Sequence, residues 1–131
     1  MGFSLQIITP KGIYFDKEVQ SLTIKLSSGY RTILAGHAPL IGSLAYAPMH
    51  LYKDGKLEEF ALHGGAINIT KDKVSVVCNA IESKTEIDLE RAQQAKERAE
   101  KRLSEKDPNL DTKRAELALK RALVRLELAS K

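Results

Sequence analysis

The chain of 131 residues lacks several features that define common classes of protein. It has a single cysteine, Cys78, so no internal disulfide can form, which is typical of a cytosolic context. Cys78 ends the apolar run KVSVVC and is expected to be a buried, unreactive thiol. No apolar stretch reaches the roughly 18 residues needed to span a bilayer. The N-terminal MGFSLQIIT lacks the pattern of a signal or transit peptide, and we expect neither a membrane span nor a leader.

Aromatic side chains are scarce and the charge is nearly balanced. Phe, Tyr and Trp make up 5% of the chain, tryptophan is absent, and no aromatic residue follows Phe60. The net charge is +4, and residues 84–131 carry 13 basic and 10 acidic groups. A nucleic-acid-binding surface usually combines a one-sided basic excess with aromatics on which bases stack. The composition therefore argues against a nucleic-acid partner.

Up to about residue 82, apolar and polar residues alternate. LTIKL, INIT and KVSVV show this period of two, which is typical of half-buried strands. Asp54-Gly55 tolerates the positive φ angles of a two-residue hairpin turn. Gly64-Gly65 is expected to form a bulge or a tight turn. The pattern predicts an antiparallel β-sandwich or barrel over residues 1–83.

Beyond that point the period of the apolar residues becomes 3.6, which is typical of helices. Two capping-box spacings mark a helix start: Ser83 with Glu86, and Thr85 with Asp88. This helix should end near Leu103, because Asp107-Pro108-Asn109 breaks it. Asp111 can cap a second helix. Residues 84–131 are therefore predicted to form an antiparallel two-helix hairpin.

The two predicted helices repeat one pattern. IDLERAQQAKERAEKRL (87–103) and LDTKRAELALKRALVRL (110–126) share eight identities in 17 positions. Each places alanines and one leucine on a single stripe: Ala92, Ala95, Ala99, Leu103 and Ala115, Ala118, Ala122, Leu126. Arginines flank each stripe: Arg91, Arg98, Arg102 and Arg114, Arg121, Arg125. Alanines allow close approach but bury little area, so the hairpin should be well defined and weakly held.

The second helix is the more apolar of the two. Leu117, Leu119, Leu123 and Val124 stand where the first helix has Gln94, Lys96, Glu100 and Lys101. The first helix is therefore expected to be the outer one. The second needs a further packing surface, which is either the sandwich or another protein.

Residues that would support catalysis are not grouped in the sequence. His37, His50 and His63 do not have metal-ligand spacing, and no Ser-His-Asp or Cys-His arrangement is visible. His37 alone lies in a distinctive loop, LAGHAPL, where a structural or interface role is favoured. We interpret the chain as non-enzymatic and without a metal site.

GHAPL (36–40), the Gly64-Gly65 strand and IDLERA (87–92), in this order and spacing, resemble the epsilon subunit of F-type ATP synthases. The resemblance covers essentially the whole chain. It implies a β-sandwich followed by a helical hairpin, in a rotor subunit of the central stalk without catalysis of its own. The sandwich (1–83) would bind the gamma subunit and the ring of membrane c subunits. The protein would lie at the cytoplasmic face of a bacterial inner membrane, held there only through the complex.

In that family the hairpin (84–131) has two states. Folded on the sandwich it permits ATP hydrolysis, and extended along gamma into the alpha/beta catalytic head it blocks hydrolysis. Several bacterial members bind regulatory ATP in the folded state, and no other cofactor is implied. The matching residues here are Glu82, Ile87, Asp88, Arg91, Ala92, Arg98, Arg121 and Arg125.

Arginines from two helices can clamp a polyphosphate. Asp88 would orient the base or ribose, or simply cap the helix. In the opposing interpretation the arginines are solvated or pair with glutamates, namely Glu90, Glu97 and Glu127.

One loop departs from the family pattern. Members read close to GELGVLPGHAPL where this chain reads GYRTILAGHAPL, so that Tyr30, Thr32 and Ala35 are substitutions. Because the family meets the c ring here, the resemblance places Tyr30, Arg31 and His37 on the c-ring side.

An alternative function belongs to another class. The basic hairpin would recruit an acidic protein, and the sandwich would serve as an inert platform. Loss of the hairpin would then abolish partner binding, whereas in a rotor subunit it would leave assembly intact.

Overall fold

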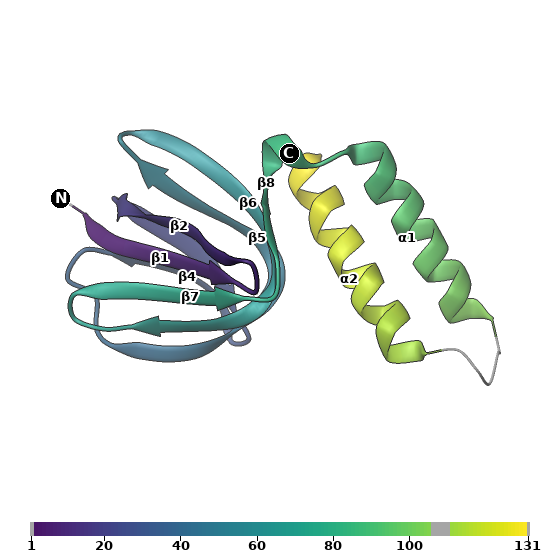
Figure 1. The fold of residues 1–131 in the computed structure, drawn as a ribbon, viewed down its shortest axis with the longest axis horizontal. Coiled ribbons are helices and arrows are strands. Elements are labelled where there is room, and N and C mark those ends of the chain that lie inside the picture. Colours follow the sequence, from purple (N-terminus) through teal and green to yellow (C-terminus); the bar gives the residue numbers. More distant parts are fainter. Residues whose placement is uncertain (1, 106–110, 131) are drawn as a thin grey trace.

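The computed structural model describes residues 2–105 and 111–130, which form a curled β-sheet followed by two antiparallel helices (Figure 1). The strands are β1 (Phe3–Thr9), β2 (Gly12–Val19), β3 (Ser21–Leu26), β4 (Gly29–Leu34), β5 (Leu40–Lys53), β6 (Lys56–Ile69), β7 (Lys73–Cys78) and β8 (Ile81–Ser83). A 3-10 turn, η1 (Lys84–Glu86), leads to α1 (Leu89–Ser104) and α2 (Thr112–Ala129). The predicted fold class, a β-sandwich followed by a two-helix hairpin, is confirmed.

The sandwich is one sheet with the strand order β2-β1-β7-β6-β5-β3-β4, and β8 pairs with β6. β5 and β6 have 14 residues each and bend, so that the two halves of the sheet face each other (Figure 1). One pairing differs from the antiparallel expectation, because β1 and β7 run parallel, with Leu5 opposite Val74 and Ile7 opposite Val76. The cause is a long-range connection: parallel neighbours need a crossover, which local alternation does not reveal.

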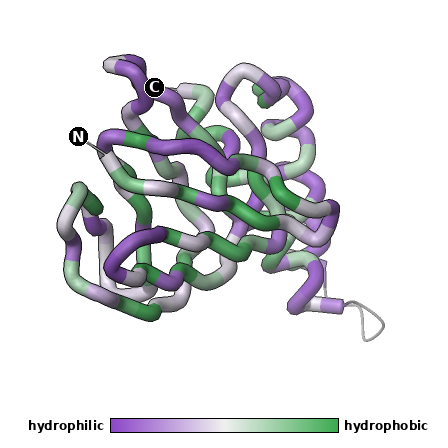
Figure 2. Tube along the Cα trace, turned by 60° about the vertical axis from the view of Figure 1, so that its left-hand side comes forward, coloured by the Kyte–Doolittle hydropathy of each residue, from purple (hydrophilic) through white to green (hydrophobic). Residues whose placement is uncertain are grey.

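The alternating pattern places the apolar residues inside. Leu22, Ile24, Val74 and Val76 are fully buried, in one cluster that draws on β1, β2, β3, β4, β5, β6 and β7. In Figure 2, apolar segments follow the strands and are interrupted by polar ones. Cys78 is buried, as expected, and that burial raises the pKa of its thiol to about 11, which disfavours the reactive thiolate.

Two glycine-containing turns were expected in the strands, and one is found. Asp54 and Gly55 have φ angles of 53° and 75° and close the β5–β6 hairpin. The expectation of a bulge or tight turn at Gly64-Gly65 is wrong. Both residues lie inside β6, and the register with β5 is the same on either side of them. They bend the strand through positive φ angles of 71° and 140° instead.

The inner and outer helices are arranged as expected. α2 packs against α1 on one side and against β5 and β6 on the other, while α1 packs mainly on α2 (Figure 1). Four alanines of the predicted stripe are buried between the helices: Ala92, Ala99, Ala115 and Ala122. Val124 and Leu128 meet Ala61 of β6 in a second, much smaller apolar cluster. Of the two helices, α2 is therefore the one that docks the hairpin on the sandwich, and η1 adds polar contacts from Lys84 to Glu59 and from Glu86 to Tyr14.

The first helix begins later than its capping box suggests. Ser83 and Glu86 form the box, but it closes only η1, and the Thr85 hydroxyl bonds to Ser83. The chain is extended again at Ile87, and Asp88 caps α1. Asp111 caps α2 as predicted. The predicted break at residues 107–109 lies outside the described residues, and no helix within the described ranges is long and apolar enough to cross a membrane.

Candidate functional site

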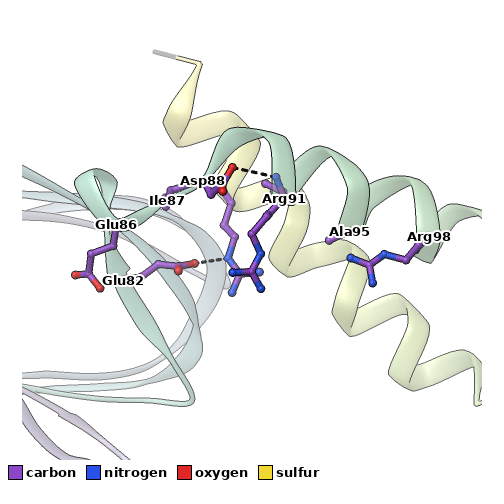
Figure 3. Close-up of a pocket in the computed structure, with 9 residues that line it drawn as sticks. Glu82, Glu86, Ile87, Asp88, Arg91, Ala95 and Arg98 are labelled. Atoms are coloured by element: carbon purple, nitrogen blue, oxygen red, sulfur yellow. Dashed lines mark hydrogen bonds and ion pairs between the residues drawn. The ribbon is translucent and has the colours of Figure 1, made fainter.

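A cavity of about 250 Å³ lies where β8, the start of α1 and the second half of α2 meet (Figure 3). It is lined by Glu82, Glu86, Ile87, Asp88, Arg91, Ala92, Ala95, Arg98 and Arg125. The structure thus brings together seven of the eight residues singled out in the sequence. The eighth, Arg121, does not line the cavity. It lies close enough to the neighbouring His63 for its charge to lower the pKa of that imidazole.

Each of the three carboxylates in the cavity is already engaged by the protein. Glu82 accepts a hydrogen bond from the Arg125 guanidinium, with which it forms an ion pair. Asp88 accepts the backbone N–H of Arg91 at 3.2 Å, which is the capping role that the sequence left open.

Glu86 completes this group. Its Oε1 accepts the Ser83 hydroxyl at 2.9 Å and the Tyr14 hydroxyl at 3.3 Å. The bonds from Ser83 hold the pKa of Glu86 below its usual range, so this carboxylate is ionised at neutral pH. The pKa of Tyr14 is raised to about 12 by burial and then by Glu86, so its hydroxyl keeps its proton and donates.

Two arginines of the cavity have no such partner. Among the described residues, no ion pair or side-chain hydrogen bond joins Arg91 or Arg98 to an acid, so the pairs with Glu90, Glu97 or Glu127 that the opposing interpretation offered do not form here. The two side chains leave α1 on the same side (Figure 3). Seven residues along a helix correspond to roughly 10 Å. That length is the rise along the helix axis between the two backbone positions. The cavity is therefore lined on one side by two guanidinium groups that can bind an anion.

A buried histidine, which the sequence suggested neither as a metal ligand nor as a site residue, contacts one of the carboxylates that line the cavity. His63 of β6 is 1% exposed, and its Nε2 lies 3.2 Å from Glu82 Oε1. Burial lowers the pKa of His63, and the charges of Arg125 and Arg121 lower it further against the opposing effect of Glu82. The signal that could have found it is a histidine inside the apolar strand segment ALHGG.

This shift in the pKa of His63 predicts a loss of stability in mild acid. Because the folded protein holds His63 neutral, its contribution is complete above the ordinary pKa of 6.5 and is lost as the pH falls below that value. We expect the melting temperature of the wild type to fall more between about pH 7.5 and about pH 5 than that of His63→Gln, which does not titrate. Melting temperatures are measured by circular dichroism. An equal fall in the wild type and in His63→Gln would contradict the lowered pKa of His63.

The three residues of the loop singled out for a partner do not form one cluster. Tyr30 on β4 is 54% exposed, its hydroxyl donates to the Pro48 carbonyl of β5 at 3.4 Å, and burial and then Glu127 of α2 raise its pKa. Arg31 is exposed. The His37 ring packs edge-on against Phe3 of β1 at 5.5 Å. Tyr30 thus lies toward α2, whereas His37 lies against β1.

Within residues 2–105 and 111–130, no three His, Cys, Asp or Glu side chains gather closely enough to hold a metal ion.

Comparison with known proteins gives consistent matches along the chain. The family model for the ATP synthase, Delta/Epsilon chain, beta-sandwich domain matches residues 2–84, and the one for the long alpha-helix domain matches residues 85–130. The ATP synthase epsilon chain of Bacillus cytotoxicus is 41% identical over 128 residues, covering 98% of this chain and 96% of that protein. The ATP synthase epsilon chain of Natranaerobius thermophilus is 43% identical over 129 residues, covering 97% and 92%.

A solved structure shows the same fold. A chain in the Euglena gracilis mitochondrial ATP synthase structure, titled OSCP/F1/c-ring, matches with a TM-score of 0.85 at 23% identity. The match covers 99% of this chain and 82% of that one.

Proposed function

The chain belongs to the ATP synthase delta/epsilon chain family, and on that premise we propose that it is a non-catalytic rotor subunit of the central stalk. Residues 1–83 form the domain that binds the gamma subunit and the c ring. Residues 84–131 form a regulatory hairpin that can reach the alpha/beta catalytic head and inhibit ATP hydrolysis. The subunit is peripheral, at the cytoplasmic face of a bacterial inner membrane, and is held there through the complex. The bacterial epsilon chains among its relatives support this assignment.

The packing of the hairpin supports a mobile regulatory element. α1 rests on α2 through alanines, each of which contributes about 1 kcal/mol or less. α2 reaches the sandwich through the small cluster of Ala61, Val124 and Leu128 and through the Glu82–Arg125 ion pair. A two-state element needs a free-energy difference of only a few kcal/mol between its states. The small apolar area that holds the folded hairpin suits that requirement.

We propose that the cavity binds regulatory ATP. The observation that carries this proposal is the pair of unpartnered arginines, Arg91 and Arg98, in a cavity whose carboxylates are all engaged. They would bind the phosphates, with Arg125 and the nearby Arg121 adding positive charge from α2. Ile87 and Ala92 offer apolar surface to the base. Because both helices and β8 contribute, bound ATP would stabilise the folded hairpin, by about 2.7 kcal/mol at a hundredfold excess over Kd.

Calorimetric titration of the full chain with Mg-ATP tests the site. We expect saturable 1:1 binding in the wild type and an affinity at least about tenfold lower in Arg91→Ala, because a charge-assisted contact to phosphate is lost. Arg114→Ala is the matched control, since it removes the same charge from an exposed position on α2 that does not line the cavity. Its affinity should equal that of the wild type.

Two outcomes contradict the proposal. Absence of heat at millimolar Mg-ATP would mean that the arginines meet a protein partner instead. An equal loss in Arg91→Ala and Arg114→Ala would mean that only the overall charge of the hairpin matters.

The contact with the c ring is proposed for Arg31 on β4 and for His37 in the segment between β4 and β5. Tyr30 would lie at the border between that contact and the hairpin, since it bonds to β5 and lies near Glu127 of α2.

The alternative function, an adaptor that recruits an acidic protein, would use the same arginines, because Arg91 and Arg98 also suit an acidic protein surface. The rotor and adaptor functions predict different effects of removing the hairpin: assembly stays intact for a rotor subunit, and partner binding is lost for an adaptor.

A further inference from the structure

Three side chains from separate parts of the fold meet at one carboxylate. Glu82 comes from β8, His63 from β6 and Arg125 from α2, and Glu82 Oε1 accepts a hydrogen bond from both of the others. Figure 3 shows Glu82 reaching toward α2, with the ion pair drawn between them. The two strands belong to the sandwich and the arginine to the hairpin. The Glu82 carboxylate therefore joins the two domains at the edge of the cavity.

The chemistry of the contact fixes the state of His63. An ionised carboxylate can only accept, so the proton of the neutral imidazole must be on Nε2 and point at Glu82. Nδ1 is then an acceptor, and it is buried without a hydrogen-bond partner among the described residues. A neutral donor holds the Glu82 oxygen in place without cancelling its charge. The full negative charge of Glu82 remains available to Arg125.

We propose that His63 is a positioning residue of the cavity: through its hydrogen bond to Glu82 it holds that carboxylate on Arg125, and so keeps it away from Arg91 and Arg98. This inference rests on the proposed function for its ligand, since it concerns the same anion site. Without His63, the Glu82 carboxylate is free to turn into the cavity and occupy the arginines that would bind phosphate. The same release weakens the ion pair that docks α2 on the sandwich.

A merely structural role for His63 is the competing explanation. The centroid of its ring also lies 6.1 Å from that of Tyr46, its cross-strand neighbour on β5, so the side chain contributes to packing on this face of the sheet. Loss of packing would weaken the fold whether or not Glu82 is present. Loss of positioning would act only through Glu82, and a conservative donor would restore it.

The test measures hairpin closure and Mg-ATP affinity in the full chain. Closure is read by energy transfer between dyes at Lys17→Cys and Lys101→Cys, two exposed positions on β2 and α1, with Cys78→Ser to remove the native thiol. Affinity is measured by calorimetry. His63→Leu removes the donor, and His63→Gln keeps an N–H close to the position of Nε2. Both are made alone and with Glu82→Ala, which gives a double-mutant cycle.

We expect His63→Leu to lower Mg-ATP affinity about tenfold and to reduce the closed fraction. His63→Gln should keep most of the wild-type Mg-ATP affinity and most of the closed fraction. In the Glu82→Ala background, His63→Leu should change neither the Mg-ATP affinity nor the closed fraction, because the carboxylate that His63 positions is absent. The inference is overturned if His63→Leu has the same effect in both backgrounds, or has no effect on closure or affinity. If the wild type does not bind Mg-ATP, the proposed ATP site fails, and the closure measurements alone decide the role of His63.

Discussion

Removal of residues 84–131 is expected to leave a folded sandwich that still joins the synthase and to raise the rate of ATP hydrolysis severalfold. The buried residues of the main apolar cluster lie in strands between Phe3 and Cys78, and the partly buried Ile81 of β8 packs against them. The hairpin adds only the small cluster in which Val124 and Leu128 cover Ala61. Its loss therefore uncovers a limited apolar area, while the register of the sheet does not depend on it.

The measurement compares synthase assembled with the full chain and with residues 1–83, by subunit content and by ATPase rate. A chain ending at residue 110 is the useful control, because α1 without α2 loses the partner on which it packs. This chain should match residues 1–83 both in its content in the synthase and in the raised ATPase rate. If the truncated chain is missing from the complex, the hairpin is needed for partner binding, and the adaptor function is favoured over the rotor function.

Substitution of alanine for Gly65 should destabilise the sandwich by about 4 kcal/mol or more, close to the whole stability of a small domain. A Cβ at this position would lie 2.1 Å from the Val77 carbonyl oxygen and 2.7 Å from the Cys78 Cα, both of them backbone atoms that cannot turn aside. The φ of 140° adds strain of its own. Urea denaturation followed by circular dichroism measures the effect.

Gly29 provides the matched control for that substitution. Its φ of 126° is similarly unfavourable for alanine, but nothing lies within 4 Å of the added carbon. Gly29→Ala should therefore cost only the backbone strain, about 1–2 kcal/mol. Equal losses at the two positions would show that the close approach of β7 to Gly65 does not matter.

Local patterns in the sequence were enough for most of the architecture. The alternation of apolar and polar residues identified buried strand residues such as Leu22 and Val76, because one face of each strand packs in the core and the other faces solvent. Asp54-Gly55 identified a hairpin, since few residues tolerate its backbone angles. The alanine stripe identified the face between the helices, and the richer apolar content of the second helix placed it inside. The resemblance to epsilon subunits singled out residues that the fold brings to one cavity.

What the sequence determined by itself is what depends on neighbours along the chain: the strand and helix periods, the Asp54-Gly55 turn, and the cap at Asp111. Only the tertiary structure decided which distant groups meet. The parallel pairing of β1 with β7, the contact of Gly65 with Val77, and the sharing of Glu82 by His63 and Arg125 all join segments far apart in the sequence. Local propensity carries no information about such pairs. They are set by the cost of leaving a buried polar group unpaired and by the packing of the whole core.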